Sequence, residues 1–142
     1  MNDPSPAPEP TVGELMTREP VVVRVDAPLR DAARLMDEHR VSGLPVVDAD
    51  GLLVGVLSHT DLVRARATEH LWKDWPGLVV RHLMTATALT ALPSMSATDA
   101  ARLMEEHHVH RLIVVSEDGR TAVGVISTTD LVRAMARELQ DE

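Results

Sequence analysis

A phrase of eleven residues that occurs twice constrains the fold more than any other feature of this sequence. The chain reads GVLSHTDLVRA at Gly55–Ala65 and GVISTTDLVRA at Gly124–Ala134. The likeness extends upstream, because residues 12–51 and residues 80–119 share 18 identities in 40 positions. The chain is therefore a tandem duplication, and two copies of this length are too few and too long for a solenoid. We expect two equivalent halves with the same fold.

Each copy is predicted to form a β-α-β-β-α unit, which gives a mixed α/β fold of the α+β type. A β-branched run at residues 20–25 predicts a first strand, and residues 88–92 are its weaker equivalent. A helix with helical spacing of small and apolar residues follows. Its predicted stripe is Leu29, Ala32, Ala33 and Met36 in one copy and Ala97, Ala100, Ala101 and Met104 in the other. Two strands joined by a turn ending in Gly are predicted at residues 44–47 and 54–57, and at residues 112–115 and 123–126. The repeated phrase then begins the last helix.

The same alignment predicts the domain boundaries. The two copies span residues 12–68 and 80–137, joined by a linker at residues 69–79. The Pro-rich residues 1–11 predict a disordered tail, and residues 138–142 a short C-terminal one. The linker holds Trp72 and Trp75, which either pack over the joint between the copies or stack on a ligand.

Composition excludes several classes of function. The 142 residues include no cysteine, so disulfides, thiolate metal sites and cysteine nucleophiles are excluded. The net charge of −8, the absence of Phe and Tyr and the presence of only two Trp disfavour nucleic-acid binding. No apolar run approaches the roughly 18 residues of a membrane span, and the N-terminus lacks the pattern of a signal peptide. We expect a cytoplasmic protein without membrane or nucleic-acid partners.

The repeated phrase has two chemical readings, and the sequence leaves both open. Ser58 with Asp61, and Ser127 with Asp130, have the spacing of a capping box that closes a helix N-terminus. The same N-terminus presents unpaired N–H groups and a positive dipole end, which suit a phosphate. The carboxylate could accept hydrogen bonds from the cis-diol of a ribose. Gly55 and Gly124 would let another group approach the strand closely.

The chain resembles a pair of CBS domains, which together form a Bateman module. The resemblance rests on ELMT, LRDAARLMDEHRVSGLPVVDADG and GVLSHTDLVRA in the first copy, and on HLMT, SATDAARLMEEHHVHRLIVVSEDG and GVISTTDLVRA in the second. It implies two repeats packed with pseudo-two-fold symmetry and a homodimer. It also implies an adenosine ligand (AMP, ADP, ATP or S-adenosylmethionine) that acts as a regulatory ligand, with no required cofactor. The output would act in trans on an unknown effector protein.

The resemblance also implies which residues bind the ligand. Asp61 and Asp130 would hold ribose hydroxyls, and Ser58 and Ser127 with the backbone amides that follow them would contact phosphate. The base would lie near Val21 and Leu89. The full predicted set is Val21, Gly43, Leu44, Pro45, Ser58, His59, Thr60, Asp61, Leu89, His110, Arg111, Ser127, Thr128, Thr129 and Asp130. The second copy departs from the family at Ile113, where the first copy has the usual proline, Pro45.

The two copies differ at one chemically informative place. The second has His110-Arg111 where the first has Ser42-Gly43. Arg111 either forks onto a phosphate or pairs on the surface with the acidic residues 105–106.

Other chemistry is weakly supported. The segment EEHHVH at residues 105–110 carries possible metal ligands, but it runs from a helix end into a strand, so no metal site is predicted. No nucleophile with a neighbouring base and no P-loop is present, so we expect no catalytic residues and no enzyme. The alternative to a ligand sensor is a structural dimerisation or protein-interaction module without a working nucleotide site.

Overall fold

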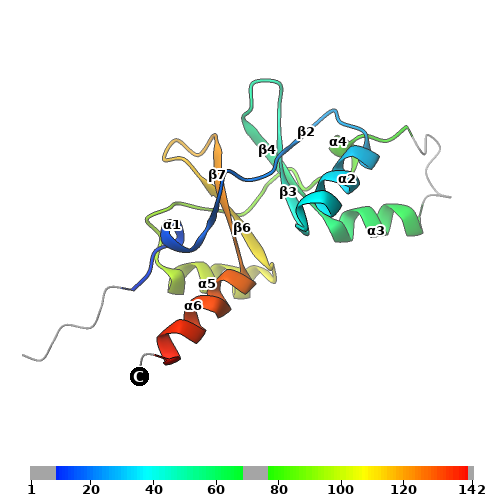
Figure 1. The fold of residues 1–142 in the computed structure, drawn as a ribbon. Helices are drawn as coiled ribbons and strands as arrows, with labels where there is room; N and C mark the ends of the chain where they lie inside the picture. Colours follow the sequence, from blue (N-terminus) through cyan, green and yellow to red (C-terminus); the bar gives the residue numbers. More distant parts are fainter. Residues whose placement is uncertain (1–8, 69–76, 141–142) are drawn as a thin grey trace, which may run out of the picture.

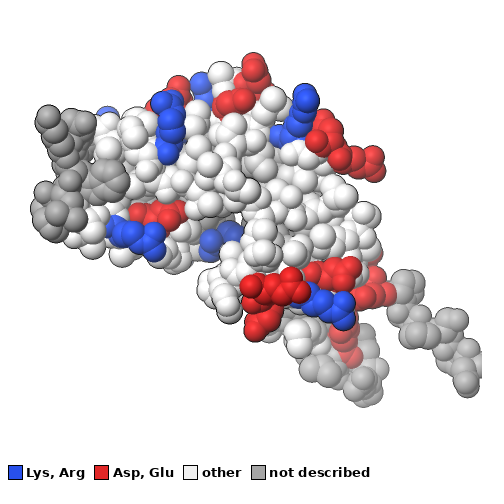
Figure 2. Space-filling view, turned by 180° about the vertical axis from the view of Figure 1, so that it is seen from behind, with Lys and Arg blue, Asp and Glu red and all other residues white. Residues whose placement is uncertain are grey.

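The structure is a computed structural model that describes residues 9–68 and 77–140. Trp72 and Trp75 lie outside these residues, so both readings of the linker tryptophans stay predictions. No helix in the described ranges is long and apolar enough to cross a bilayer. On the face shown in Figure 2, acidic and basic side chains are scattered and the basic ones form no continuous surface.

The predicted β-α-β-β-α order is confirmed in both halves (Figure 1). The first half contains α1 (Val12–Leu15), β1 (Thr17–Arg18), β2 (Val23–Arg24), α2 (Leu29–His39), β3 (Gly43–Val47), β4 (Leu53–Ser58) and α3 (His59–Ala67). The second contains α4 (Val80–Leu83), β5 (Thr90–Ala91), α5 (Ala97–His107), β6 (Arg111–Val115), β7 (Ala122–Ser127) and α6 (Thr128–Gln140). Figure 1 shows a pair of helices beside the strands of each half, α2 with α3 in the first and α5 with α6 in the second.

The first strand of each unit is shorter than predicted. The segment expected at residues 20–25 is a strand only at β2, which runs parallel to β3 with Val23 opposite Val46. The segment expected at residues 88–92 is a strand only at β5, with Thr90 opposite Ile113 in β6. Pro20 has no N–H to donate, and Pro93 directly follows the second segment, so pairing is confined to the middle of each run.

The two halves exchange their N-terminal segments, which the sequence reasoning did not predict. β1 belongs to the first copy but pairs antiparallel with β7 of the second, with Thr17 opposite Val125. The equivalent residue of the second copy, Thr85, bridges Val56 in β4 of the first copy. Figure 1 shows α1 beside the β6–β7 half and α4 beside the β3–β4 half. A pseudo-two-fold relation between the halves accounts for these reciprocal contacts.

The glycines of the repeated phrase make this exchange possible. A Cβ atom at Gly55 would lie 2.6 Å from the carbonyl oxygen of Thr85, and one at Gly124 would lie 2.5 Å from Sδ of Met16. The predicted close approach at these glycines therefore exists, and the approaching group is the exchanged segment of the other copy rather than a ligand. The backbone pairing that the glycines permit includes Val56 N–H to Thr85 O at 3.0 Å and the reverse bond at 2.9 Å.

Each half has its own core, and each core includes a residue of the other copy's short helix. Val12 of α1 is fully buried with Leu112, Val114 and Ile126, and Val80 of α4 is fully buried with Leu44, Val46 and Leu57. Burial of this apolar surface is the main term that holds the exchanged segments in place.

The predicted helix stripes are only partly buried. Leu29, Ala32 and Met36 are buried in α2, and Ala100 and Met104 in α5. Ala33 and Ala101 are instead exposed on the outer side of the two helices. The stripe that faces the core is therefore narrower than predicted, and the remaining small residues lie on an outer helical face.

Candidate functional site

Two cavities lie between the halves at equivalent places. The first, which we call the Asp61 cavity, has a volume of about 320 Å³. It is lined by seven of the predicted ligand-binding residues: Ser58, His59, Thr60, Asp61, Leu89, His110 and Arg111. The second, the Asp130 cavity, has a volume of about 520 Å³. Its lining includes the predicted residues Val21, Gly43, Arg111, Ser127, Thr129 and Asp130. Both volumes lie in the range of small-molecule sites.

Each cavity is built from both copies. In the Asp61 cavity, the start of α3 comes from the first copy, whereas Thr85, Leu89 and Arg111 come from the second. The Asp130 cavity has the reverse composition, with the start of α6 facing Val21 and Gly43. The exchange of β1 and of the segment after α4 creates this arrangement, because it brings residues of one copy next to the N-terminus of the other copy's last helix.

The capping reading of the repeated phrase is realised at both helices. Asp61 Oδ2 accepts from the backbone N–H of Ser58 at 2.8 Å, and Ser58 Oγ accepts from the N–H of Asp61 at 3.2 Å. Asp130 Oδ2 accepts from Ser127 N–H at 2.8 Å and from Ser127 Oγ at 3.0 Å. The reciprocal bond from Asp130 N–H to Ser127 Oγ measures 3.2 Å.

The helix cap uses only one of the two carboxylate oxygens of each aspartate. Only Oδ2 of each aspartate takes part in the cap, while Oδ1 faces an arginine of its own helix. Asp61 Oδ1 is 3.8 Å from Nη1 of Arg64, and Asp130 Oδ1 is 3.6 Å from Nη1 of Arg133, so both are ion pairs without a hydrogen bond. The aspartate side chains are 16% and 13% exposed. One oxygen thus closes the helix, and the other is available to a ligand.

The backbone amides at each helix start are mostly occupied. His59 N–H donates to Ser42 O at 2.8 Å, and Thr128 N–H donates to His110 O at 2.9 Å. With Asp61 and Asp130 N–H held by the serines, the amides of Thr60 and Thr129 are the ones among the first three without a partner in the described chain. These two amides are the better candidates for phosphate contact.

Arg111 makes a contact between the two copies that the sequence did not predict. Its guanidinium donates to Ser42 Oγ across the boundary between copies, and among the described residues no ion pair joins it to Glu105 or Glu106. Burial lowers the pKa of the Arg111 guanidinium, and the nearby Asp61 carboxylate opposes that shift. Arginine side chains stay protonated in proteins, so the guanidinium carries its positive charge. A half-buried cation therefore lies where the two cavities meet.

Three predicted residues line neither cavity. Leu44 and Pro45 are fully buried, with Leu44 in the core of the first half. Thr128 lies instead beside Leu131 and Met135 in a hollow of the helical face. Their neighbours Gly43 and Thr129 are the residues that reach the Asp130 cavity.

Several lining residues were not predicted from the sequence. Thr85 and Thr87 line the Asp61 cavity, and Thr17, Arg40 and Arg133 line the Asp130 cavity. The repeated LMT triplet, which ends in Thr17 and Thr85, carried a signal for two of them. The triplet indicates a cavity position only once it is known that each copy's segment pairs with the sheet of the other copy.

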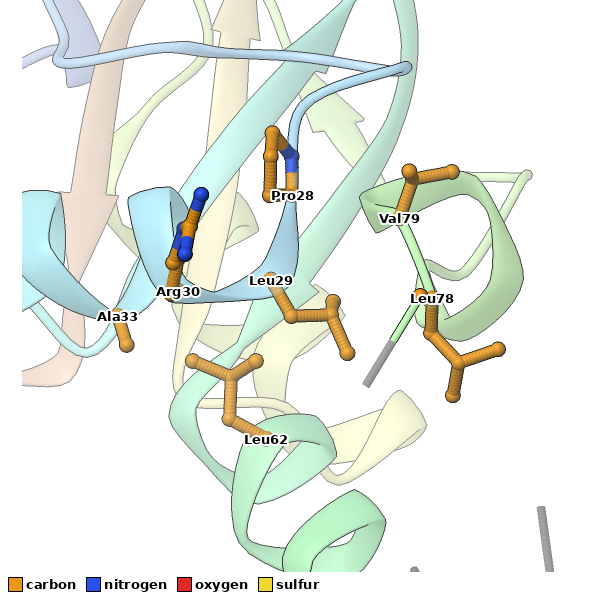
Figure 3. Close-up of a pocket in the computed structure, with 8 residues that line it drawn as sticks. Pro28, Leu29, Arg30, Ala33, Leu62, Leu78 and Val79 are labelled. Atoms are coloured by element: carbon orange, nitrogen blue, oxygen red, sulfur yellow. The ribbon is translucent and has the colours of Figure 1, made fainter. Parts of the chain in front are cut away.

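A third cavity lies apart from this chemistry. It has a volume of about 660 Å³ and lies between α2, α3 and the residues before α4 (Figure 3). Its lining is apolar apart from Arg30, so the described residues there offer no carboxylate for a ribose. The described residues also contain no group of three or more His, Asp or Glu that could hold a metal ion.

The chain is similar to known proteins over most of its length. The CBS domain family matches residues 12–68 and again residues 80–137. Protein MJ1426 of Methanocaldococcus jannaschii is 30% identical and covers 87% of this chain and 93% of its own length. The crystal structure of Arabidopsis thaliana CBSX2 in complex with AMP is 37% identical. It has a TM-score of 0.79 and covers 90% of this chain and 97% of its own.

The same pair of repeats also occurs within a longer enzyme. Inosine-5'-monophosphate dehydrogenase of Bifidobacterium longum is 36% identical over 83% of this chain. The match spans only 21% of that enzyme, so the likeness covers the repeats and not the rest of the enzyme.

Proposed function

This chain belongs to the CBS domain family, and on that premise we propose that it is a regulatory module that binds an adenosine ligand in the cavities between its two repeats. The observation that carries the proposal is the same at both cavities. A capped helix N-terminus faces the cavity with one carboxylate oxygen that the cap does not use. The AMP complex of the CBSX2 relative supports adenosine ligands as the class.

The proposed binding mode assigns a role to each part of the cavity. Oδ1 of Asp61 or Asp130 accepts hydrogen bonds from the ribose hydroxyls. The adenine lies against the apolar wall that contains Leu89 and Ile113 in one cavity and Val21 in the other. The free amide of Thr60 or Thr129 and the guanidinium of Arg111 bind phosphate. AMP, ADP, ATP and S-adenosylmethionine share the adenosine part, so each is a candidate.

The proposed output is a change in the angle between the halves. A ligand in either cavity touches both copies, because the helix start and the facing wall come from different copies. Closing the cavity on a ligand therefore moves one half against the other. We infer that this movement is passed to an effector protein, and that the module performs no catalysis of its own.

Ligand-induced stabilisation tests the proposed function. An adenosine ligand at 100 times its dissociation constant is expected to raise the free energy of unfolding by about 2.7 kcal/mol. For a chain of this size that corresponds to a rise in melting temperature of several degrees. Thermal melts with AMP, ADP, ATP and S-adenosylmethionine measure it, and inorganic phosphate is the control. An unchanged melting temperature with all four would contradict nucleotide sensing and favour the interaction module.

We also propose that the module forms a homodimer through its outer helical face. Val63 of α3 and Val132 of α6 occupy equivalent positions and are 65% and 61% exposed, and Met135 is 55% exposed. Ala33 and Ala101 lie exposed on the neighbouring helices. Apolar side chains at equivalent places on both halves fit a symmetric interface with a second copy.

A charge on this face is expected to disrupt the dimer. The double substitution Val63→Asp and Val132→Asp would bury two unpaired carboxylates, so we expect the dimer dissociation constant to rise at least about 10-fold. Sedimentation equilibrium measures it. Val22→Asp, at an exposed position of the segment between β1 and β2, is the matched control and should leave association unchanged. A monomeric unaltered protein would contradict the proposed dimer.

A further inference from the structure

Arg111 lies where the two cavities meet, and the fold has room for only one such side chain. Among the described residues it is the one residue that lines both cavities. Its counterpart in the first copy is Gly43, which has no side chain. A Cβ atom at Gly43 would lie 3.0 Å from Cδ, Nε and Nη1 of Arg111, so the arginine lies across the space that a side chain at Gly43 would need.

Arg111 interacts with one group of each cavity, by a hydrogen bond in one case and by charge in the other. Its Nη2 donates to Ser42 Oγ, and Ser42 lines the Asp130 cavity. The carboxylate that acts on its charge is Asp61, which lines the other cavity. A guanidinium in this place can donate to a phosphate on either side. It cannot present the same N–H groups to both sides at once.

The remaining charges make the two cavities unequal. Arg40 and Arg133 also line the Asp130 cavity, together with Glu19 and Asp130. The Asp61 cavity has no Lys or Arg besides Arg111 among its described lining residues, and its other basic groups are His59, His108 and His110. Once Arg111 is engaged by a phosphate in the Asp130 cavity, no Lys or Arg is left among the described lining residues of the Asp61 cavity to neutralise a second phosphate. Arg64 lies 3.8 Å from Oδ1 of Asp61 but does not line that cavity.

We propose that Arg111 couples the two cavities, so that phosphate-bearing adenosine ligands bind them anticooperatively. This inference rests on the proposed function. The Asp130 cavity takes the first phosphate with Arg111, and the Asp61 cavity then prefers an adenosine ligand without phosphate. Because a coupling free energy acts equally in both directions, a phosphate in the Asp61 cavity weakens phosphate binding in the Asp130 cavity by the same factor.

Calorimetric titrations with AMP and with adenosine test the coupling. AMP is expected to bind in two steps, the second about 10-fold or more weaker than the first, which is the size of a lost hydrogen bond to a charged group. Adenosine carries no phosphate, so its two steps should lie closer together. Protein saturated with one AMP should still bind adenosine at the second site.

Arg111→Ala provides the matched variant, because the equivalent position in the first copy is already a residue without a side chain. It should weaken the first AMP step about 10-fold or more and bring the two steps together, with little effect on adenosine. Arg102→Ala removes one positive charge from the exposed surface of α5 and should change neither titration. A melting curve confirms that each variant is folded.

The outcomes separate this inference from the proposed function. If neither AMP nor adenosine binds, the proposed function fails. If both bind, but the two AMP steps are equal in the unaltered protein, the coupling is overturned while nucleotide binding stands. A gap between AMP steps that persists in Arg111→Ala also overturns the role of Arg111.

Discussion

Gly55→Ala is expected to lower the free energy of unfolding by about 1–3 kcal/mol, the usual cost of overpacking a close contact. The added Cβ would lie 2.6 Å from the carbonyl oxygen of Thr85. That oxygen is backbone and accepts from Val56 N–H, so relief requires the exchanged segment to move away from β4. Since Thr85 also lines the Asp61 cavity, ligand binding there should weaken as well. Chemical denaturation measures the change in stability.

Gly124→Ala is the matched comparison at the equivalent position. Its closest contact would be Sδ of Met16, the flexible end of a side chain, with the backbone oxygen of Thr17 further away at 2.9 Å. Met16 can change rotamer at lower cost than a paired backbone can move, so Gly124→Ala should destabilise less than Gly55→Ala. The reverse order, or full stability in both variants, would contradict the close exchange of segments described above.

The second large effect is expected at Asp130. Asp130→Asn can place its amide oxygen where Oδ2 accepts from Ser127 N–H, so the helix cap is retained. Its NH₂ group then replaces Oδ1 and cannot accept from a ribose hydroxyl. AMP affinity at the Asp130 cavity should therefore fall about 10- to 150-fold, equivalent to about 1.5–3 kcal/mol for a hydrogen bond to a charged group. Isothermal titration calorimetry measures the affinity, and a melting curve the stability.

Two further variants separate the cap from the ligand contact. Asp130→Ala should lose both, with an additional cost in stability of about 1 kcal/mol for the cap. Ser96 caps α5 by accepting from Asp99 N–H at 3.1 Å, and it lines neither cavity. Ser96→Ala should therefore lower stability by a similar amount and leave AMP affinity unchanged. If Asp130→Asn binds AMP as tightly as the unaltered protein, the aspartate is only a cap.

The parts of the fold that depend on local sequence could be predicted. The duplication, the helices with their apolar spacing and the Ser–Asp caps all follow from residues close together in the chain. The turn glycines Gly51 and Gly119 have φ of 81° and 75°, as their place in the predicted turns requires. The predicted pairing of the two central strands in each half is likewise found in β3 with β4 and in β6 with β7.

The exchange between halves could not be predicted from the repeats. The exchanged segments at residues 12–17 and 80–85 agree at four of six positions, so the sequence alone does not say which sheet each one joins. Gly55 and Gly124 indicated that something approaches the strand, but a ligand and a chain segment leave the same signal. The exchange determines which residues share a cavity, because it places the helix N-terminus of one copy opposite the cavity wall formed by the other copy.

The position of Arg111 also depends on the packed halves. The sequence showed the difference between His110-Arg111 and Ser42-Gly43, and it suggested two partners for the arginine. The hydrogen bond to Ser42 joins residues 69 positions apart and exists only because the two copies face each other there. Complementarity across the pseudo-two-fold relation, a long side chain opposite a glycine, explains the difference between the copies.

A crystal structure of the protein grown with AMP tests the central claim most directly. We expect AMP between the repeats, with its ribose hydroxyls on Oδ1 of Asp130 and its phosphate beside Arg111 and the Thr129 amide. AMP bound elsewhere, such as in the apolar cavity between α2 and α3, would contradict adenosine binding between the repeats. Empty Asp61 and Asp130 cavities at saturating AMP would contradict it equally.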